Sequence, residues 1–131
     1  MHGLLLFQMA KLVEMDERVG IFKQMEEDVG PVILINKFTV SPEEFEQFLK
    51  GWAAEAEKFK EQPGFISTQL HKGIGGSGTF INFAVWESAG HFKRAVNKVM
   101  DPQDRLAAYP PSTVASPHLF KKVAVLGICV E

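Results

Sequence analysis

Apolar side chains along this chain recur with two different periods, and each change of period marks a new structural element. Three short runs are rich in β-branched and aromatic residues and predict strands: residues 32–40, 65–72 and 79–86. Between the first two runs, from residue 41 to residue 61, apolar side chains recur at helical spacing and predict an amphipathic helix. A second helical stripe, which includes Phe92, follows Ser88 and predicts another helix.

Capping and turn residues set the ends of these elements. Ser41 is the predicted N-cap of the first helix, and Glu44 completes an S-x-x-E capping box. Pro63-Gly64 ends that helix, and the glycine-rich residues 73–78 join two strands as a hairpin. The same glycines match G-x-G-x-x-G, but a dinucleotide site needs a helix after them, and here a strand follows.

The two ends of the chain carry weaker patterns. A helical stripe predicts a helix over residues 3–16. After the second helix, residues 101–108 predict a short helical turn, and the prolines of residues 109–117 predict an irregular crossing. Residues 119–130 predict the last strand.

The predicted order after residue 30 is β-α-β-β-α-β. This is the ferredoxin-like pattern, an α+β fold with a four-stranded antiparallel sheet. We therefore divide the chain into an N-terminal helical extension, residues 1–30, and one domain, residues 31–131. Two helices cover one face of such a sheet, yet Ile33 and Ile35 make the other face apolar too. The uncovered face predicts a homodimer that packs sheet against sheet.

Composition limits the classes of partner. The 131 residues are 46% hydrophobic and 23% charged, and 11 phenylalanines predict an aromatic core or a cavity lined with rings. A net charge of −2 provides no basic excess for nucleic acid. No apolar run approaches the roughly 20 residues that span a membrane. The single cysteine, Cys129, excludes an internal disulfide and fits the cytoplasm, where we expect the protein.

Four segments, in this order and spacing, resemble the antibiotic biosynthesis monooxygenase family of dimeric α+β barrels. They are ILINKFTV with SPEEFEQFLKGW, then QPGFISTQLHKG, FINFAVWES and YPPSTVASPHLFKKVAV. The resemblance covers about residues 31–130. It implies an apolar cavity between helices and sheet, in which some members oxygenate anthrones or quinols with O2 and no metal or flavin. The fold also hosts heme-degrading enzymes and proteins without assigned roles.

Three residues are candidates for catalysis. Asn36 interrupts an apolar strand face, and its amide is suited to hydrogen-bond a substrate oxygen; the heme-degrading relatives carry an Asn at the matching place. Trp86 ends a strand and is suited to stack on an aromatic ligand. His71 is a candidate general base. Each also has a structural interpretation: Asn36 satisfies a buried backbone group, Trp86 fills the core, and His71 lies on the surface.

Five further residues are candidates for substrate binding: Trp52, Phe92, Arg105, Tyr109 and His118. Trp52 belongs to the apolar face of the first helix, where core packing is the alternative role. Arg105 and Tyr109 follow the second helix, where either could close over a bound anion or phenol. His118 follows a proline and could anchor the crossing at the cavity mouth.

No cofactor and no metal are expected. The histidines have no metal-ligand spacing, and Cys129 stands alone. In the heme-degrading relatives an Asn, a Trp and a His share one pocket. Asn36 matches the first, but Ala95 and Arg105 stand where the Trp and the heme-ligating His would be. His91 is the alternative heme ligand.

Three functions stay open. The first is a cofactor-independent monooxygenase that oxidises a small phenolic, quinol or polycyclic aromatic substrate with O2. The second is a heme-binding or heme-degrading protein, and the third is a non-catalytic dimer that binds a small molecule. In each case the partners are a second copy of the chain and a small, mostly aromatic molecule, and neither nucleic acid nor a membrane is expected.

Overall fold

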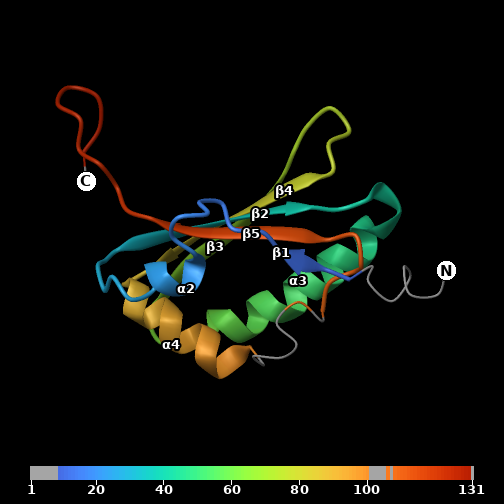
Figure 1. Cartoon of the computed structure of the whole chain (residues 1–131), viewed down its shortest axis with the longest axis horizontal. Coiled ribbons are helices and arrows are strands. Elements are labelled where there is room, and N and C mark those ends of the chain that lie inside the picture. The colour runs from blue at the N-terminus through green and yellow to red at the C-terminus, as the bar shows by residue number, and fades with distance from the viewer. Residues whose placement is uncertain (1–8, 101–105, 107, 131) are drawn as a thin grey trace.

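A mixed β-sheet forms the centre of the molecule in a computed structural model that describes residues 9–100, 106 and 108–130 (Figure 1). Over these residues the sheet has five strands in the order β1-β5-β2-β4-β3. The strands are β1 (Lys11–Leu12), β2 (Val32–Thr39), β3 (Phe65–Lys72), β4 (Thr79–Trp86) and β5 (Val114–Phe120). β1 runs parallel to β5, and the other neighbours are antiparallel. The fold is therefore α+β and ferredoxin-like, with one short strand added at an edge.

All helices of the described chain lie on one face of this sheet (Figure 1). They are α2 (Ile21–Gln24), α3 (Phe45–Lys60), which follows the 3-10 turn η1 (Pro42–Glu44), and α4 (Ala89–Val99). The core lies between helices and sheet in two clusters. One surrounds Trp86 and α4, and the other joins Phe38, Phe48 and Phe80. Burial of these rings is the main force that holds α3 and α4 on the sheet.

The central predictions are confirmed nearly to the residue. β3 and β4 occupy the predicted ranges, and β2 ends one residue early. Gly75 and Gly76 have φ of 71° and 78° in the hairpin, a conformation that glycine adopts without strain. Ser88 caps α4, because its Oγ accepts a hydrogen bond of 3.0 Å from the His91 backbone N–H. These elements follow from local sequence signals that tertiary packing does not override.

The N-terminal helix prediction is wrong where the structure describes it. Residues 9–16 contain β1 instead of a helix, and residues 3–8 lie outside the described range. The Lys11 N–H donates to the Thr113 carbonyl at 3.0 Å, and the Val13 N–H donates to the Ala115 carbonyl at 2.8 Å. Backbone carbonyl groups at the edge of β5 thus accept hydrogen bonds from the N-terminal segment, and this pairing between distant segments has no local sequence signal. The sheet is mixed and five-stranded, not four-stranded and antiparallel.

The last strand also lies elsewhere than predicted. β5 begins at Val114, inside the predicted irregular crossing, and ends at Phe120. It pairs with β2 from Thr39 opposite Val114 to Ile33 opposite Phe120. β2 extends one residue beyond this pairing, to Val32, and the chain after Phe120 leaves the sheet (Figure 1). The predicted helical turn over residues 101–108 falls mostly outside the described residues.

The capping box predicted at Ser41 is wrong. The Ser41 side chain makes no capping hydrogen bond, and a 3-10 turn precedes α3. Instead, Glu44 Oε1 accepts from the Ser112 N–H, and Ser112 Oγ accepts from the Ser41 N–H, both at 3.0 Å. These polar groups tie the loop before β5 to the start of α3. Their partner is 68 residues or more away along the chain, which no local motif reveals.

The sheet face away from the helices carries apolar side chains in the described structure. Ile81, Phe83 and Phe120 are 36–39% exposed there, and Ile33 and Ile35 are half-buried beside them. The predicted two-faced apolar character of β2 and β4 is therefore confirmed. None of the described helices is long and apolar enough to cross a membrane.

Candidate active site

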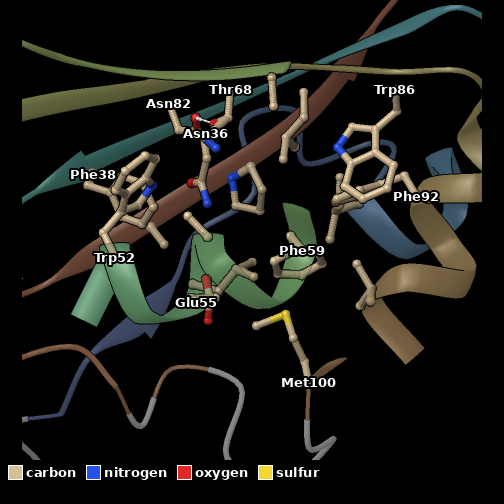
Figure 2. Close-up of a pocket in the computed structure, with 18 of the residues that line it drawn as sticks. Asn36, Phe38, Trp52, Glu55, Phe59, Thr68, Asn82, Trp86, Phe92 and Met100 are labelled. Carbon is tan, nitrogen blue, oxygen red and sulfur yellow. Dashed lines mark hydrogen bonds between the residues drawn. The ribbon is translucent and has the colours of Figure 1, made fainter. Parts of the chain in front are cut away.

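A pocket of about 110 Å³ lies between the sheet and the helices (Figure 2). Strands β2, β3, β4 and β5 form one wall, α3 and α4 form the opposite wall, and β1 and α2 close one end. Its lining is mostly aliphatic and aromatic, with a few polar groups. Such a lining binds a flat apolar ligand and fixes its orientation through few hydrogen bonds.

Asn36 enters this pocket from β2 because strand side chains alternate between faces. Its register partners are Asn82 on β4 and Pro117 on β5. Asn82 Oδ1 accepts a hydrogen bond from Thr68 Oγ1, so that amide has a partner (Figure 2). The Asn36 Oδ1 atom is buried and has no hydrogen-bond partner among the described residues. An unpaired buried amide is costly, which marks Asn36 as a group that a ligand would satisfy.

Trp86 serves the pocket as a wall. It is 1% exposed, and its indole packs against Phe59, Phe65 and Phe92 with ring centroids 6.1, 5.4 and 5.5 Å away. Trp86 and Phe92 line the pocket, as does Trp52 from α3 (Figure 2). Trp86 is therefore part of the buried core and also lines the pocket.

Glu55 places a carboxylate in the same wall. It lies on α3 between Trp52 and Phe59, and its Oε1 accepts a hydrogen bond of 2.8 Å from the Tyr109 hydroxyl. Burial raises the pKa of the Glu55 carboxyl, although the Tyr109 hydrogen bond and the charge of Lys58 oppose the shift. Burial and the neighbouring carboxylate also raise the pKa of the Tyr109 hydroxyl, which therefore stays a donor.

Tyr109 is held in place by backbone and rings. A Cβ on Gly51 would lie 2.2 Å from the Ala108 carbonyl oxygen, so glycine at this point of α3 allows the segment to approach. The Tyr109 ring then stacks on Phe48 and contacts Phe38, with centroids 5.5 and 5.4 Å away. Tyr109 is thus a fixed hydrogen-bond donor beside the pocket.

Sequence reasoning missed Glu55, Thr68 and Asn82. A signal for Glu55 was present, since it stands three residues after Trp52 and four before Phe59, within the apolar stripe of the helix. Asn82 lies an even number of residues from the buried Phe80, Ala84 and Trp86 of β4, so its side chain is on the same, helix-facing side. No sequence signal indicates that Thr68 bonds Asn82, because that contact depends on the register of β3 with β4.

Other predicted site residues lie outside the pocket. In the sheet register, His71 stands opposite Ile81 and His118 opposite Ile35, so both histidines belong to the face away from the helices. His91 lies on α4 with Nδ1 2.7 Å from Ser88 Oγ, and it does not line the pocket. Arg105 lies outside the described residues.

No group of three or more histidine, cysteine or carboxylate side chains in the described part of the chain is arranged to hold a metal ion.

A sequence model described as antibiotic biosynthesis monooxygenase matches residues 31–99, just over half of the chain. The chain belongs to the antibiotic biosynthesis monooxygenase family. It is 35% identical over 71 residues to a deoxynogalonate monooxygenase of Streptomyces nogalater, and the match spans 53% of this chain and 58% of that relative.

Solved structures extend the likeness within this family. SnoaB, a cofactor-independent oxygenase from Streptomyces nogalater, superposes with a TM-score of 0.63 at 26% identity, covering 76% of this chain and 99% of its own. A heme-degrading protein from Mycobacterium tuberculosis superposes with a TM-score of 0.55 at 25% identity, covering 74% of this chain and 96% of its own. The family fold therefore occurs in both kinds of protein.

The family match begins at residue 31, so the pocket end formed by β1 and α2 comes from outside it. Ile21 and Met25 are buried in this end and face the pocket. The Gln24 side chain anchors α2, because its Oε1 accepts from the Leu119 N–H at 2.8 Å. In this family member the N-terminal segment therefore helps to set the shape of the cavity.

Proposed function

We propose that this protein is a cofactor-independent monooxygenase that oxidises a small phenolic, quinol or polycyclic aromatic substrate with O2 in the pocket. The observation that carries the proposal is Asn36, whose buried side-chain oxygen has no partner among the described residues, in a cavity that is mostly aromatic and aliphatic. The likeness to a cofactor-independent oxygenase supports it.

The chemistry asks little of the protein. A deprotonated phenol or enol is electron-rich enough to pass one electron to O2, after which the two radicals combine. The protein must hold the substrate dry, orient it and stabilise the negative oxygen. Trp86, Phe92 and Trp52 supply flat apolar walls. The unpaired Asn36 Oδ1 accepts a hydrogen bond from the substrate hydroxyl before it ionises. The NH2 group of the same amide donates to the ionised oxygen and favours that form.

The volume of the cavity indicates which candidate substrates fit without a change in its walls. About 110 Å³ is comparable to an engineered apolar cavity of roughly 150 Å³ that binds benzene. A substrate with one ring therefore fits the pocket as it stands. A polycyclic substrate requires the pocket wall to move.

Oxygen uptake tests this proposal. Chelator-treated protein is supplied with a panel of quinols and anthrones, and autoxidation in buffer is subtracted. Wild type should show saturable uptake, and Asn36→Ala should lower it at least tenfold, about 1.4 kcal/mol of barrier. Asn97→Ala, an exposed asparagine on α4, is the matched control and should keep full activity. Uptake equal to buffer across the panel, or an unaffected Asn36→Ala, would contradict the proposal.

We also infer that the working unit is a homodimer that buries the sheet face with Ile35, Phe83 and Phe120. Contiguous apolar surface of this kind normally meets a partner. A second copy offers the same apolar rows and needs no charge complementarity.

A further inference from the structure

A monooxygenase of the proposed kind must remove a proton from its substrate before O2 can react. The histidines of the described chain do not line the pocket. Glu55 and Tyr109 are the ionisable side chains among the described residues that do. The Tyr109 hydroxyl donates a hydrogen bond to Glu55 and the residue is 6% exposed, so this hydroxyl is not available as a base.

We propose that Glu55 is the catalytic proton acceptor of this pocket and that Tyr109 is its positioning residue. The inference rests on the proposed oxygenase function and assigns a step of it to a named group. Glu55 projects from α3, and Asn36 lies across the pocket on β2 (Figure 2). A flat substrate bound between these walls places its oxygen atom toward the Asn36 amide and its acidic C–H or O–H group toward the Glu55 carboxylate. Tyr109 occupies one carboxylate oxygen and fixes the group's orientation.

The proton and electron balance can be written for an anthrone. Glu55 takes one proton from the methylene carbon, and the carbanion passes one electron to O2, which becomes superoxide. The two radicals combine in a C–O bond, and protonated Glu55 returns its proton to give the hydroperoxide. Glu55 then takes the second methylene proton while the O–O bond breaks, and the departing hydroxide receives that proton as water. The products are one ketone and one water, and Glu55 ends as it began.

The environment of Glu55 suits this cycle. Burial raises the pKa of its carboxyl, so it holds a proton more strongly than an exposed glutamate and remains able to return it. The groups that act on it are the Tyr109 hydroxyl, from the segment after α4, and the ammonium of Lys58, from α3 itself.

The test separates proton removal from oxygenation. Without O2 and in D2O, the protein is incubated with anthrone and with the smaller ketone 2-tetralone, and deuterium entering the acidic methylene is followed by NMR. Wild type should exchange faster than buffer, and Glu55→Gln should lower the excess rate by about 100-fold or more. Glu57→Gln, an exposed glutamate on the same helix, is the matched control and should exchange as wild type does.

A second variant guards against misfolding of the first. Tyr109→Phe removes the hydroxyl that favours the charged carboxylate, so the pH midpoint of exchange should move upward while exchange persists. An unchanged midpoint, exchange unaffected by Glu55→Gln, or exchange by wild type no faster than buffer with both ketones would each overturn the assignment.

Oxygen uptake by the same variants distinguishes the two proposals. Exchange that depends on Glu55, without uptake of O2, would refute the oxygenase and leave the proton acceptor standing. Uptake of O2 that is unaffected by Glu55→Gln would refute the proton acceptor and leave the oxygenase standing.

Discussion

Replacing Asn36 by leucine should stabilise the protein and abolish its activity. The Asn36 Oδ1 atom is buried without a partner among the described residues, and such a group costs about 1–3 kcal/mol of stability. Leucine has nearly the same size and leaves no polar atom unsatisfied. The free energy of unfolding should therefore rise by about 1–3 kcal/mol.

The expected temperature shift follows from chain length. With an unfolding entropy of about 2.1 cal/mol/K per residue, 131 residues give roughly 0.28 kcal/mol/K. A gain of about 1–3 kcal/mol then raises Tm by about 4–11 °C. Differential scanning calorimetry and denaturant titration measure this directly, and oxygen uptake on the most active quinol should fall to the buffer rate.

Asn82→Leu is the matched control, because Asn82 stands beside Asn36 in the sheet and differs in having a partner. Its loss leaves the Thr68 hydroxyl without its acceptor, so the protein should become less stable by about 1–3 kcal/mol. Opposite signs for the two variants would support the assignment of Asn36 as a ligand-binding group. If Asn36→Leu destabilises the protein as Asn82→Leu does, the amide has a structural partner and the reasoning fails.

Four further predictions test other parts of the structure. Met25→Ala should cost about 2–5 kcal/mol of stability, and calorimetric titration should show a shift in preference toward larger phenols, because the buried Met25 side chain lines the pocket end. Glu55→Gln should have a higher Tm than wild type at neutral pH, and this difference should vanish below the ordinary glutamate pKa of about 4.3. The reason is that burial raises the pKa of Glu55, so wild type is most stable with this carboxyl protonated and loses that stability as the pH rises through the folded pKa. Phe83→Glu should convert a dimer mass to a monomer mass in light scattering, because it places a charge on the open sheet face. Hemin titration should give no saturable one-to-one Soret shift, because His91 lies outside the pocket with its ring nitrogen beside Ser88.

Each of these predictions has a contrary outcome. An unchanged ligand preference in Met25→Ala would remove the N-terminal segment from the pocket. Equal Tm values of Glu55→Gln and wild type at every pH would mean that this carboxyl is not perturbed. A dimer mass for Phe83→Glu would place the interface elsewhere. A stoichiometric Soret shift that His91→Ala abolishes would favour the heme hypothesis.

The central elements could be predicted because their signals are local. Alternation separated two rows of side chains in β2 and in β4, and in β2 it placed Asn36 on the row opposite Ile33 and Ile35. Which row of β4 faces the helices was left open by the sequence, and the pairing with β2 decides it. The glycines of the hairpin and the cap at Ser88 depend on residues within a few positions of one another. Local preference and tertiary packing agree at these points, so the sequence was sufficient.

The candidate site could be predicted only in part. Asn36, Trp52 and Trp86 come together because each lies on an apolar stripe whose direction the period reveals. His71 and His118 were chosen for their chemistry, but the same alternation puts them on the opposite face of the sheet. A residue type suited to catalysis is therefore a weak indication of a site unless the side chain also points toward the cavity.

The sequence by itself determined the family, the order of the central elements and the two apolar faces of the sheet. Tertiary structure alone decided that residues 11–12 join β5 as a strand and that β5 pairs with β2 from Val114 to Phe120. It also decided that Glu55 meets Tyr109, a contact between residues 54 positions apart that depends on the close approach at Gly51. These features depend on which backbone and side-chain groups become neighbours after folding, and one-dimensional periodicity carries no information about such neighbours.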